Sequence, residues 1–344
     1  MTAASSAVAD TRPGLHPLRL ARLVDEAVVR CALDLTGAVV LTEAATASYA
    51  VTPVIAARAG ASRVYAVTRS TRFGSVDQVR AETLELARLL GVDNRIQVVD
   101  EKRRAIVEDA DIVTNSGHVR PLDAEMIAWM KPSAVIPLMY ETWELRPADL
   151  DLAACREKGL LVAGTNERHP AIDVFSFLGI LAVRLLHDAG VAVFKSSVLV
   201  VCDNDFGPYI ERGLSQAGAA VDLARDAAAG QASVAYDVIL VAMTPRPGPV
   251  LSESDVRRMA ATWPDAVVAQ YFGDLDRALV ASVGLSIWPV EAPPPGHMGI
   301  LPAEVGPEPT LRLQSGGLKA GEVLWRYREH PPTAAREFID HYIV

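Results

Sequence analysis

The chain has 344 residues, of which 50% are hydrophobic, and this is enough apolar material for two packed domains. Its formal net charge of −9 argues against a nucleic-acid-binding protein, because phosphate contacts require a basic face. No apolar stretch reaches the roughly 18 residues that a membrane-spanning helix needs. The three cysteines, Cys31, Cys155 and Cys202, show no metal-ligand spacing and fit a reducing compartment. The start, MTAASSAVADTRPG, lacks the features of a secretory signal. We therefore expect a cytoplasmic protein without a metal site.

Short apolar strands alternate with longer amphipathic segments in the first half of the chain. Strands are predicted at 38–42, 62–68, 95–99, 111–115, 134–139 and 160–165. Between them lie helical patterns such as SVDQVRAETLELARLLG at 75–91. Strands separated by helices indicate a parallel sheet covered on both faces.

The second half repeats this plan, beginning with the strand SVLVVCDND and the helix GPYIERGLSQAGA. Between the halves, HPAIDVFSFLGILAVRLLHDAG predicts a long apolar helix, with Pro170 in its first turn and Gly190 just past its end. The expected fold is α/β, with two doubly wound Rossmann-like domains that have parallel sheets and are joined by this helix. The expected boundaries are an N-terminal arm and helix at 1–34, a first domain at 35–172, the linker helix at 173–195, a second domain at 196–295, and an interdomain loop with a C-terminal helix at 296–344.

The order of these pieces resembles the D-2-hydroxyacid dehydrogenase superfamily, which includes formate and glycerate dehydrogenases. The resemblance lies in LDLAACREKGLLVAGTNERHPAIDVFSFLGILAVRLL and in VLVVCDNDFGPYIERGLSQAGAAV. It implies a nicotinamide cofactor, a small-molecule substrate bound in an interdomain cleft, and a homodimer. In the first domain, AGASRVYAVTRS and GVDNRIQVVDE are also similar to S-adenosylmethionine-dependent methyltransferases, although the glycine-rich first turn of that family is absent.

The dinucleotide-binding motif that the resemblance implies is degenerate. Its three glycine positions are occupied by Cys202, Asn204 and Gly207, although the first two glycines normally allow a tight turn and close approach of a pyrophosphate. Arg225 stands where an acidic residue usually binds the ribose, and this favours NADP over NAD if either binds. The residues expected to contact the cofactor are Asp203, Asn204, Gly207, Arg225, Thr244 and Arg69. A protein that binds no cofactor is the alternative.

Polar residues that follow the strands are the candidates for catalysis, because ligands bind beyond the carboxyl ends of an open parallel sheet. Each also has a structural interpretation, as a helix cap, a turn residue or a solvated side chain. A buried carboxylate at Glu43 needs a partner, for which Arg69 or Arg168 is available. The cluster Asp203-Asn204-Asp205 predicts a capping turn rather than a magnesium site. The catalytic candidates are His118, Glu141, Arg168, His169, His297 and Glu43.

Three functions fit these observations. The first is a dehydrogenase-like enzyme that acts on a small polar metabolite, a carboxylate or amino-acid derivative, with NADP or NAD as cofactor. The second is a redox-inactive relative that catalyses an elimination, cyclisation or isomerisation. The third is a non-catalytic subunit that binds a protein partner through the former cofactor cleft.

Overall fold

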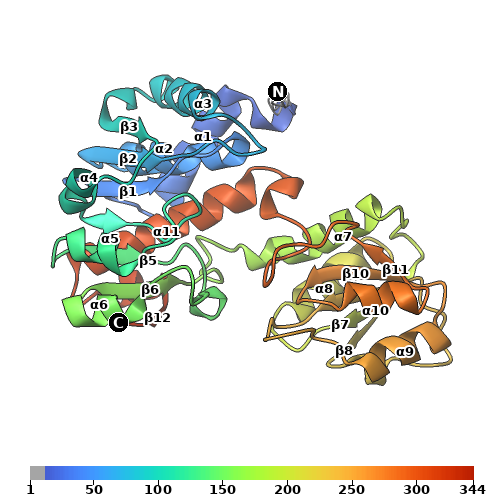
Figure 1. Cartoon of the computed structure of the whole chain (residues 1–344). Helices are drawn as coiled ribbons and strands as arrows, with labels where there is room; N and C mark the ends of the chain where they lie inside the picture. Colours follow the sequence, from blue (N-terminus) through green and yellow to red (C-terminus); the bar gives the residue numbers. More distant parts are fainter. Residues whose placement is uncertain (1–11) are drawn as a thin grey trace, which may run out of the picture. The chain divides into compact units, whose positions relative to one another are not determined.

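The computed structural model describes residues 12–344, which form two compact units (Figure 1). Unit 1 contains the chain up to Val174 together with Gly306–Val344, and unit 2 contains Phe175–Val305. Each unit is a mainly parallel sheet covered by helices on both faces, so the predicted α/β fold class is confirmed. Unit 2 is therefore inserted into the sequence of unit 1.

The sheet of unit 1 has seven strands in the order β12-β6-β5-β4-β1-β2-β3. All neighbours are parallel except β12, which runs antiparallel to β6 at one edge. The chain order reverses between β1 and β4, and this is the switch point at which doubly wound sheets bind ligands. The strands are β1 (Val39–Glu43), β2 (Arg63–Val67), β3 (Ile96–Val99), β4 (Ile112–Val113), β5 (Val135–Pro137), β6 (Leu161–Thr165) and β12 (Ile339–Tyr342).

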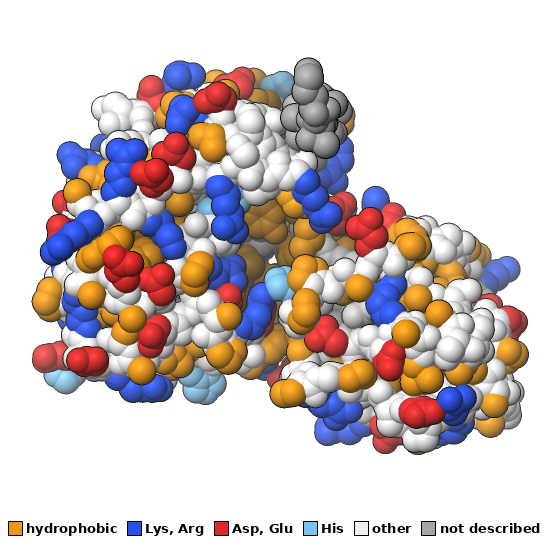
Figure 2. Space-filling model, in the orientation of Figure 1, with side chains coloured by type: hydrophobic (Ala, Val, Ile, Leu, Met, Phe, Trp, Pro, Cys, Tyr) orange, Lys and Arg blue, Asp and Glu red, His pale blue; other side chains and the backbone are white. Residues whose placement is uncertain are grey.

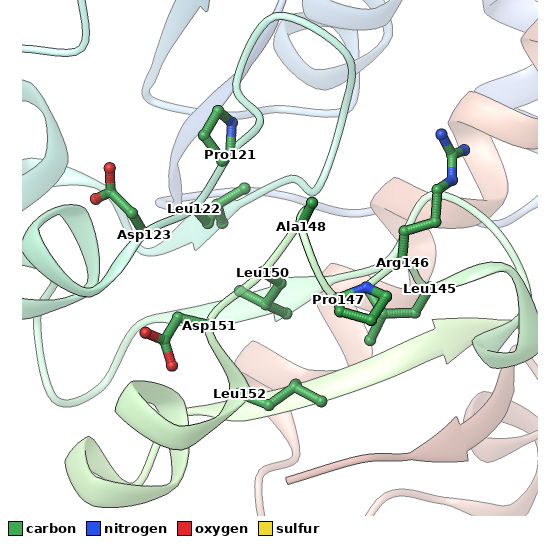
Figure 3. Close-up of a pocket in the computed structure, with 10 residues that line it drawn as sticks. All are labelled: Pro121, Leu122, Asp123, Leu145, Arg146, Pro147, Ala148, Leu150, Asp151 and Leu152. Atoms are coloured by element: carbon green, nitrogen blue, oxygen red, sulfur yellow. The ribbon is translucent and has the colours of Figure 1, made fainter. Parts of the chain in front are cut away.

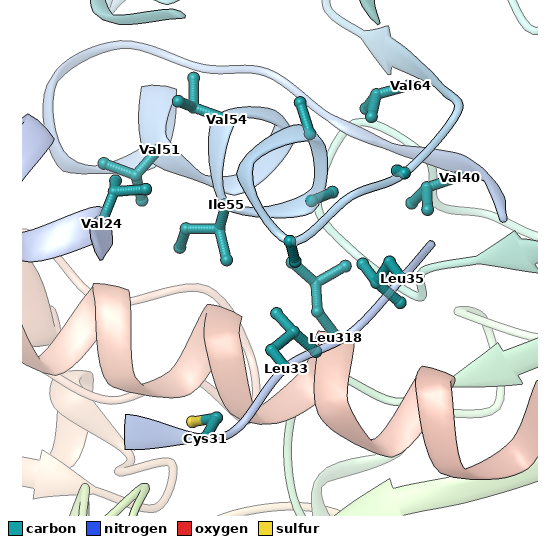
Figure 4. Packing of buried hydrophobic residues seen from close by; sticks show 14 of the residues in the cluster. Val24, Cys31, Leu33, Leu35, Val40, Val51, Val54, Ile55, Val64 and Leu318 are labelled. Atoms are coloured by element: carbon teal, nitrogen blue, oxygen red, sulfur yellow. The ribbon is translucent and has the colours of Figure 1, made fainter. Parts of the chain in front are cut away.

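Two apolar layers cover the two faces of this sheet, because side chains alternate along each strand. On β1, Val40 packs with α1, α2, α3 and α11, whereas Leu41 packs with α4, α5 and α6. Figure 4 shows the first of these layers, in which Leu318 of α11 lies among aliphatic side chains from the N-terminal part of the chain. The helices are α1 (Pro17–Arg30), α2 (Val51–Arg58), α3 (Val76–Leu89), α4 (Arg104–Asp109), α5 (Ala124–Trp129), α6 (Leu152–Lys158), α11 (Glu308–Arg326) and the short α12 (Thr333–Arg336).

Helix α11 corrects one prediction. The Pro- and Gly-rich segment from Pro289 to Gly317 was expected to be an irregular interdomain loop, but α11 begins within it. Pro309 lies in the first turn of the helix, where a missing backbone N–H costs little. The glycines allow close packing, because a Cβ at Gly317 would collide with Met139 and one at Gly321 would lie 2.8 Å from Ile112. They serve helix–sheet contact rather than chain flexibility.

The C-terminus corrects a second prediction, because PPTAAREFIDHYIV was expected to form a final helix. Only α12 is helical, and the residues after it form β12 beside β6. The prediction of a purely parallel sheet is also wrong at this edge. Branched and aromatic residues in EFIDHYIV favour a strand, and pairing with the open edge of β6 satisfies its backbone groups.

The sheet of unit 2 has five parallel strands in the order β11-β10-β9-β7-β8, so its switch point lies between β7 and β9. The predicted linker helix is shorter than expected and belongs to this unit, where it crosses α8 at a contact between Gly179 and Gly213. The strands are β7 (Ser197–Val201), β8 (Ala220–Ala224), β9 (Val238–Ala242), β10 (Val267–Phe272) and β11 (Ser286–Trp288), and the helices are α7 (Leu178–Asp188), α8 (Gly207–Gln216), α9 (Glu253–Thr262) and α10 (Arg277–Ser282).

The surface carries charges of both signs. On the face shown in Figure 2, acidic and basic side chains are interspersed, and neither sign forms a continuous patch. Within residues 12–344, no helix combines the length and the apolar character needed to cross a membrane.

Candidate functional site

Four of the predicted catalytic residues lie at the carboxyl edge of the unit 1 sheet. Glu43 ends β1, His118 follows β4, Glu141 follows β5 and Arg168 follows β6. Because β6, β5, β4 and β1 are consecutive neighbours in the sheet, these residues form a row along one edge. The sequence therefore predicted their common location, although not their partners.

Glu43 and His118 meet at the switch point between β1 and β4. The Glu43 carboxyl group is buried, and its Oε2 accepts a hydrogen bond from the His118 backbone N–H at 3.0 Å. Burial raises the pKa of Glu43, against the opposing effects of this hydrogen bond and of Arg120. Gly117 permits the approach, because a Cβ there would lie 2.6 Å from Oε2 of Glu43. The expected partner Arg69 or Arg168 is thus wrong, and Arg120 is the cation that acts on Glu43.

The His118 ring has a defined tautomer. Its Nδ1 accepts a hydrogen bond from the Arg69 backbone N–H at 3.1 Å, so Nε2 carries the proton in the neutral ring. Burial and the Arg69 charge lower the pKa of His118, which favours this neutral form. The group available to a ligand is therefore an N–H donor rather than an imidazolium.

A buried polar network follows β4 and β5. The Asn115 side-chain amide donates to the Tyr140 hydroxyl at 2.8 Å, and that hydroxyl donates to Asp149 at 3.2 Å. Arg120 pairs with the same Asp149 oxygen at 3.1 Å, and its Cζ lies 5.5 Å from the Tyr140 ring centroid. Burial raises the pKa of Tyr140, so the hydroxyl stays protonated and acts as a structural donor. Asn115 Oδ1 is buried and has no hydrogen-bond partner.

Glu141 and Arg168 form an ion pair in an open pocket of about 330 Å³. Oε2 of Glu141 accepts hydrogen bonds from Arg168 Nη2 at 3.3 Å and from Trp143 Nε1 at 2.9 Å. Only 4% of the Glu141 side chain is exposed, compared with 45% for Arg168. Burial raises the pKa of Glu141, while Trp143 and Arg168 oppose that rise.

Two further polar residues of this pocket, Asp340 and His341, were not predicted. Asp340 Oδ2 accepts hydrogen bonds from the Thr142 backbone N–H at 2.8 Å and the Thr142 hydroxyl at 2.7 Å. Its other oxygen, Oδ1, lies 2.7 Å from His341 Nδ1. The His341 side chain is 76% exposed, so the ring faces solvent with one nitrogen held by a carboxylate. They were not predicted because the segment that forms β12 was expected to be helical.

A pair of carboxyl groups lies next to Glu141 and was also missed: Glu167 is buried and Glu144 is partly buried. The side chains of Glu144 and Glu167 hydrogen-bond to each other, which requires a shared proton, and Glu167 accepts a hydrogen bond from the Glu141 backbone N–H. Burial raises the pKa of Glu144 to about 7 and raises that of Glu167 well above its usual value. Glu144 ends a short 3-10 helix (Thr142–Glu144) and Glu167 lies in a turn, so no periodic pattern distinguishes them.

His169 and His297 are held by local contacts. His169 stacks on Phe338 with ring centroids 3.8 Å apart, and its Nδ1 accepts the Ala171 backbone N–H at 3.1 Å. His297 belongs to unit 2, where its Nδ1 lies 3.1 Å from the Pro295 carbonyl oxygen.

A larger hollow of about 510 Å³ in unit 1 contains none of the predicted residues (Figure 3). Leucine and proline side chains line most of it. Its carboxylates, Asp123 and Asp151, already accept the backbone N–H groups of Met126 and Ala154 at the starts of α5 and α6. The hollow therefore offers a mainly apolar wall and few available polar groups.

The residues predicted to bind a cofactor in unit 2 are distributed around the β7–α8 turn. Gly207 begins α8 and packs against Leu223, since a Cβ there would lie 3.1 Å from that side chain. Arg225 follows β8 and is exposed. The side chains of Asp203, Asn204 and Thr244 hydrogen-bond to one another at this turn. Within residues 12–344, no group of three His, Cys, Asp or Glu side chains is placed to hold a metal ion.

Comparison with known proteins gives similarity at the level of the fold. No family model matches the chain, and no curated protein matches its sequence. A dipicolinate synthase polypeptide from Bacillus halodurans has a TM-score of 0.52 at 13% identity, covering 82% of this chain and 96% of that one. A second dipicolinate synthase polypeptide, from Bacillus subtilis, has a TM-score of 0.51 at 13% identity, covering 85% of this chain and 97% of that one.

Solved dehydrogenase structures are also similar, with lower TM-scores. One is the NAD-dependent formate dehydrogenase from Staphylococcus aureus, with a TM-score of 0.48 at 11% identity, covering 86% of this chain and 95% of that one. The two dipicolinate synthase structures share the α/β fold of this chain, with two Rossmann-like units.

Proposed function

We propose that the chain is an enzyme that binds a small carboxylate-bearing metabolite in the pocket after β5 and β6 of unit 1. The enzyme then adds a proton to this metabolite or removes one from it. The observation that carries the proposal is that one pocket contains two side chains that are each paired with a carboxylate. Arg168 pairs with Glu141, and His341 pairs with Asp340. A guanidinium binds a carboxylate through paired N–H donors. A carboxylate-oriented imidazole is a common general acid or base.

Each residue has a distinct role in this proposal. Arg168 is the anchor for the substrate carboxylate, and Glu141 fixes the direction of its guanidinium. Asp340 accepts a hydrogen bond from the protonated Nδ1 of His341, and Nε2 is then available to accept or donate a proton. Thr142 holds the other Asp340 oxygen through its N–H and hydroxyl, so the pair keeps its orientation. Proton transfer of this kind serves eliminations, cyclisations and isomerisations, which need no redox cofactor.

Nicotinamide-dependent oxidoreduction is the second candidate, and a non-catalytic partner subunit is the third. The fold supports the second, as does the exposed Arg225 after β8, which suits a 2′-phosphate and so NADP rather than NAD. The altered turn after β7 weighs against it. The name dipicolinate synthase refers to a carboxylate product, which accords with the substrate class proposed here.

Calorimetric titration of the full chain with malonate, succinate and dipicolinate tests the proposal. We expect at least one to bind, and we expect Arg168→Gln to weaken that binding about tenfold or more, because hydrogen bonds to charged groups contribute roughly 1.5–3 kcal/mol. Arg184→Gln is the matched control, since Arg184 is 47% exposed and also pairs with one carboxylate, Asp188. The proposal fails if none of the three acids binds, or if Arg168→Gln and Arg184→Gln bind alike.

The assembly and location remain predictions. The resemblance implies a homodimer, which light scattering of the purified chain would test. A cytoplasmic location is expected from the composition, and fractionation of cells that express the chain would test it.

A further inference from the structure

The switch point of unit 2 lies between β7 and β9, and the loops that follow these two strands are joined by side chains. Asp203 Oδ1 accepts hydrogen bonds from the Thr244 backbone N–H at 2.7 Å and from the Thr244 hydroxyl at 3.0 Å. Asn204 Nδ2 donates to the Ala242 carbonyl oxygen at 2.9 Å. We call these three side chains, Asp203, Asn204 and Thr244, the clamp. It bridges the crevice in which a sheet of this order binds its ligand.

Several backbone donors at the start of α8 already have acceptors within the chain. The Phe206 N–H donates to Asn204 Oδ1 at 3.0 Å, and the Gly207 N–H points to the Asn204 carbonyl oxygen at 3.5 Å. The N–H groups of Tyr209 and Ile210 both donate to the Phe206 carbonyl oxygen. Pro208, in the first turn of α8, has no N–H. A pyrophosphate is normally bound by such N–H groups at the helix start, so α8 offers it little.

The charge in this turn also opposes an anion. Asp203 and Asp205 are exposed carboxylates on either side of Asn204. A pyrophosphate at this position would approach both negative charges, and the side chain of Asn204 occupies the place that a glycine normally leaves open.

The carboxyl end of β10 is covered as well. The Gly299 backbone N–H donates to the Tyr271 carbonyl oxygen at 2.9 Å, and a Cβ on Gly299 would overlap the Gln270 carbonyl group. Asp274 accepts the Gly296 N–H at 3.1 Å, which fixes the same loop. The chain itself therefore occupies space next to this strand end.

We infer that unit 2 does not bind a dinucleotide, and that the clamp permanently closes its switch point. Unit 2 has the fold of a cofactor-binding domain, but the side chains at its switch point hydrogen-bond to one another. This inference concerns unit 2 alone and does not depend on the carboxylate pocket of unit 1.

Hydrogen exchange measured by mass spectrometry, on the full chain with millimolar NADH or NADPH, tests the inference at the site itself. A dinucleotide present at ten times its Kd would slow exchange in the protected segments about tenfold. We expect no slowing in residues 202–210 and 242–246. Slowing in either segment would overturn the inference, whereas slowing confined to unit 1 would agree with it.

A variant pair tests the clamp. Asp203→Ala removes the acceptor of the Thr244 N–H, so we expect that amide to exchange about tenfold faster, as the loss of one hydrogen bond of about 1.4 kcal/mol implies. Asp205→Ala is the control, because it removes the same charge from the same turn and leaves the acceptor of Thr244 in place. Equal exchange of the Thr244 amide in wild type and Asp203→Ala would show that the clamp is absent. Asp203→Asn retains an acceptor and should stay protected, and this separates loss of the hydrogen bond from unfolding.

Discussion

Arg168 Nη2 lies 3.3 Å from Oε2 of Glu141, and this carboxyl group is almost fully buried while the guanidinium remains half exposed. The pair therefore places a buried negative charge beneath a cation that can still reach a ligand. A buried carboxylate that loses its cation is costly, because its charge is then neither solvated nor compensated. The stability of unit 1 and the proposed ligand binding thus depend on the same two residues.

Arg168→Gln should destabilise unit 1 more at pH 8 than at pH 5. Without the guanidinium, the raised pKa of Glu141 rises further above its unfolded value, and the associated stability is lost as the pH increases through it. We expect a loss of about 1–2 kcal/mol at pH 8, less than for a fully buried pair because Arg168 is exposed. Urea denaturation at both pH values measures it. The double variant Arg168→Gln/Glu141→Gln should recover much of the loss, and an equal loss at both pH values would contradict the explanation.

The carboxyl pair Glu144–Glu167 should make the protein less stable as the pH rises from about 4.5 to about 7. In the folded state burial raises the pKa of Glu144 to about 7, so the folded chain holds a proton that the unfolded chain releases near its ordinary pKa of 4.5. Stability from the pair is complete below that value and is lost as the pH increases through the folded pKa. The raised pKa of Glu144 alone corresponds to about 3 kcal/mol, because a tenfold change in proton affinity corresponds to about 1.4 kcal/mol, and the raised pKa of Glu167 acts in the same direction.

Glu144→Gln tests this by denaturation at a series of pH values. The amide mimics the protonated carboxyl group, so the stability curve of the variant should be flatter between pH 4.5 and 7 than that of the wild type. Glu157→Gln, on the exposed surface of α6, is the control and should leave the curve unchanged. Parallel curves for Glu144→Gln and wild type would rule out a shared proton.

Asp340→Ala and His341→Ala should differ in their effect on stability, although both should reduce activity. Asp340 accepts two hydrogen bonds from Thr142, so its removal leaves two donors without their acceptor and should cost about 1–3 kcal/mol. His341 is largely exposed, and its removal should change stability by less than about 0.5 kcal/mol. Thermal unfolding compares the two. Activity is measured with a carboxylate substrate that the wild type converts, and both variants should lose this activity. Full activity in His341→Ala would show that this residue has no part in the mechanism.

Gly317→Ala should destabilise unit 1 even though alanine favours helices by up to about 1 kcal/mol over glycine. The added methyl group would collide with the Met139 side chain, and overpacking of this kind costs about 1–3 kcal/mol. Urea denaturation gives the net value. The cost should shrink in a Met139→Ala background, which makes room for the methyl group. Additive effects of the two substitutions would show that this contact does not limit the packing.

The sequence predicted the parts of the fold that depend on local pattern. The strand, helix and strand between Val39 and Val67 are present as β1, α2 and β2, because short apolar runs separated by turn residues are a local property of the sequence. Helix α11 was missed because its glycines, read as breakers, are required by contacts with strands far away in the sequence. Local pattern cannot reveal the partner that a glycine packs against.

The placement of several candidate residues after strands was predictable, but their pairing was not. Glu43, Glu141 and Arg168 follow strands, and the topology of a parallel sheet places strand ends at one edge. Which charge meets which depends on strand order, and since β6 lies beside β5 rather than β1, Arg168 reaches Glu141 instead of Glu43. His341 reaches the pocket only through the antiparallel strand β12, which joins the sheet at the end of the chain.

The insertion of unit 2 into unit 1 has a consequence for biosynthesis. A nascent chain can complete unit 2 once residue 305 has left the ribosome, yet α11 and β12 are made only afterwards. Until then, the β6 edge and the apolar face that α11 covers lack their partners. Unit 1 therefore cannot be completed before residues 306–344 are made, and premature termination after residue 305 would leave a complete unit 2 attached to an incomplete unit 1.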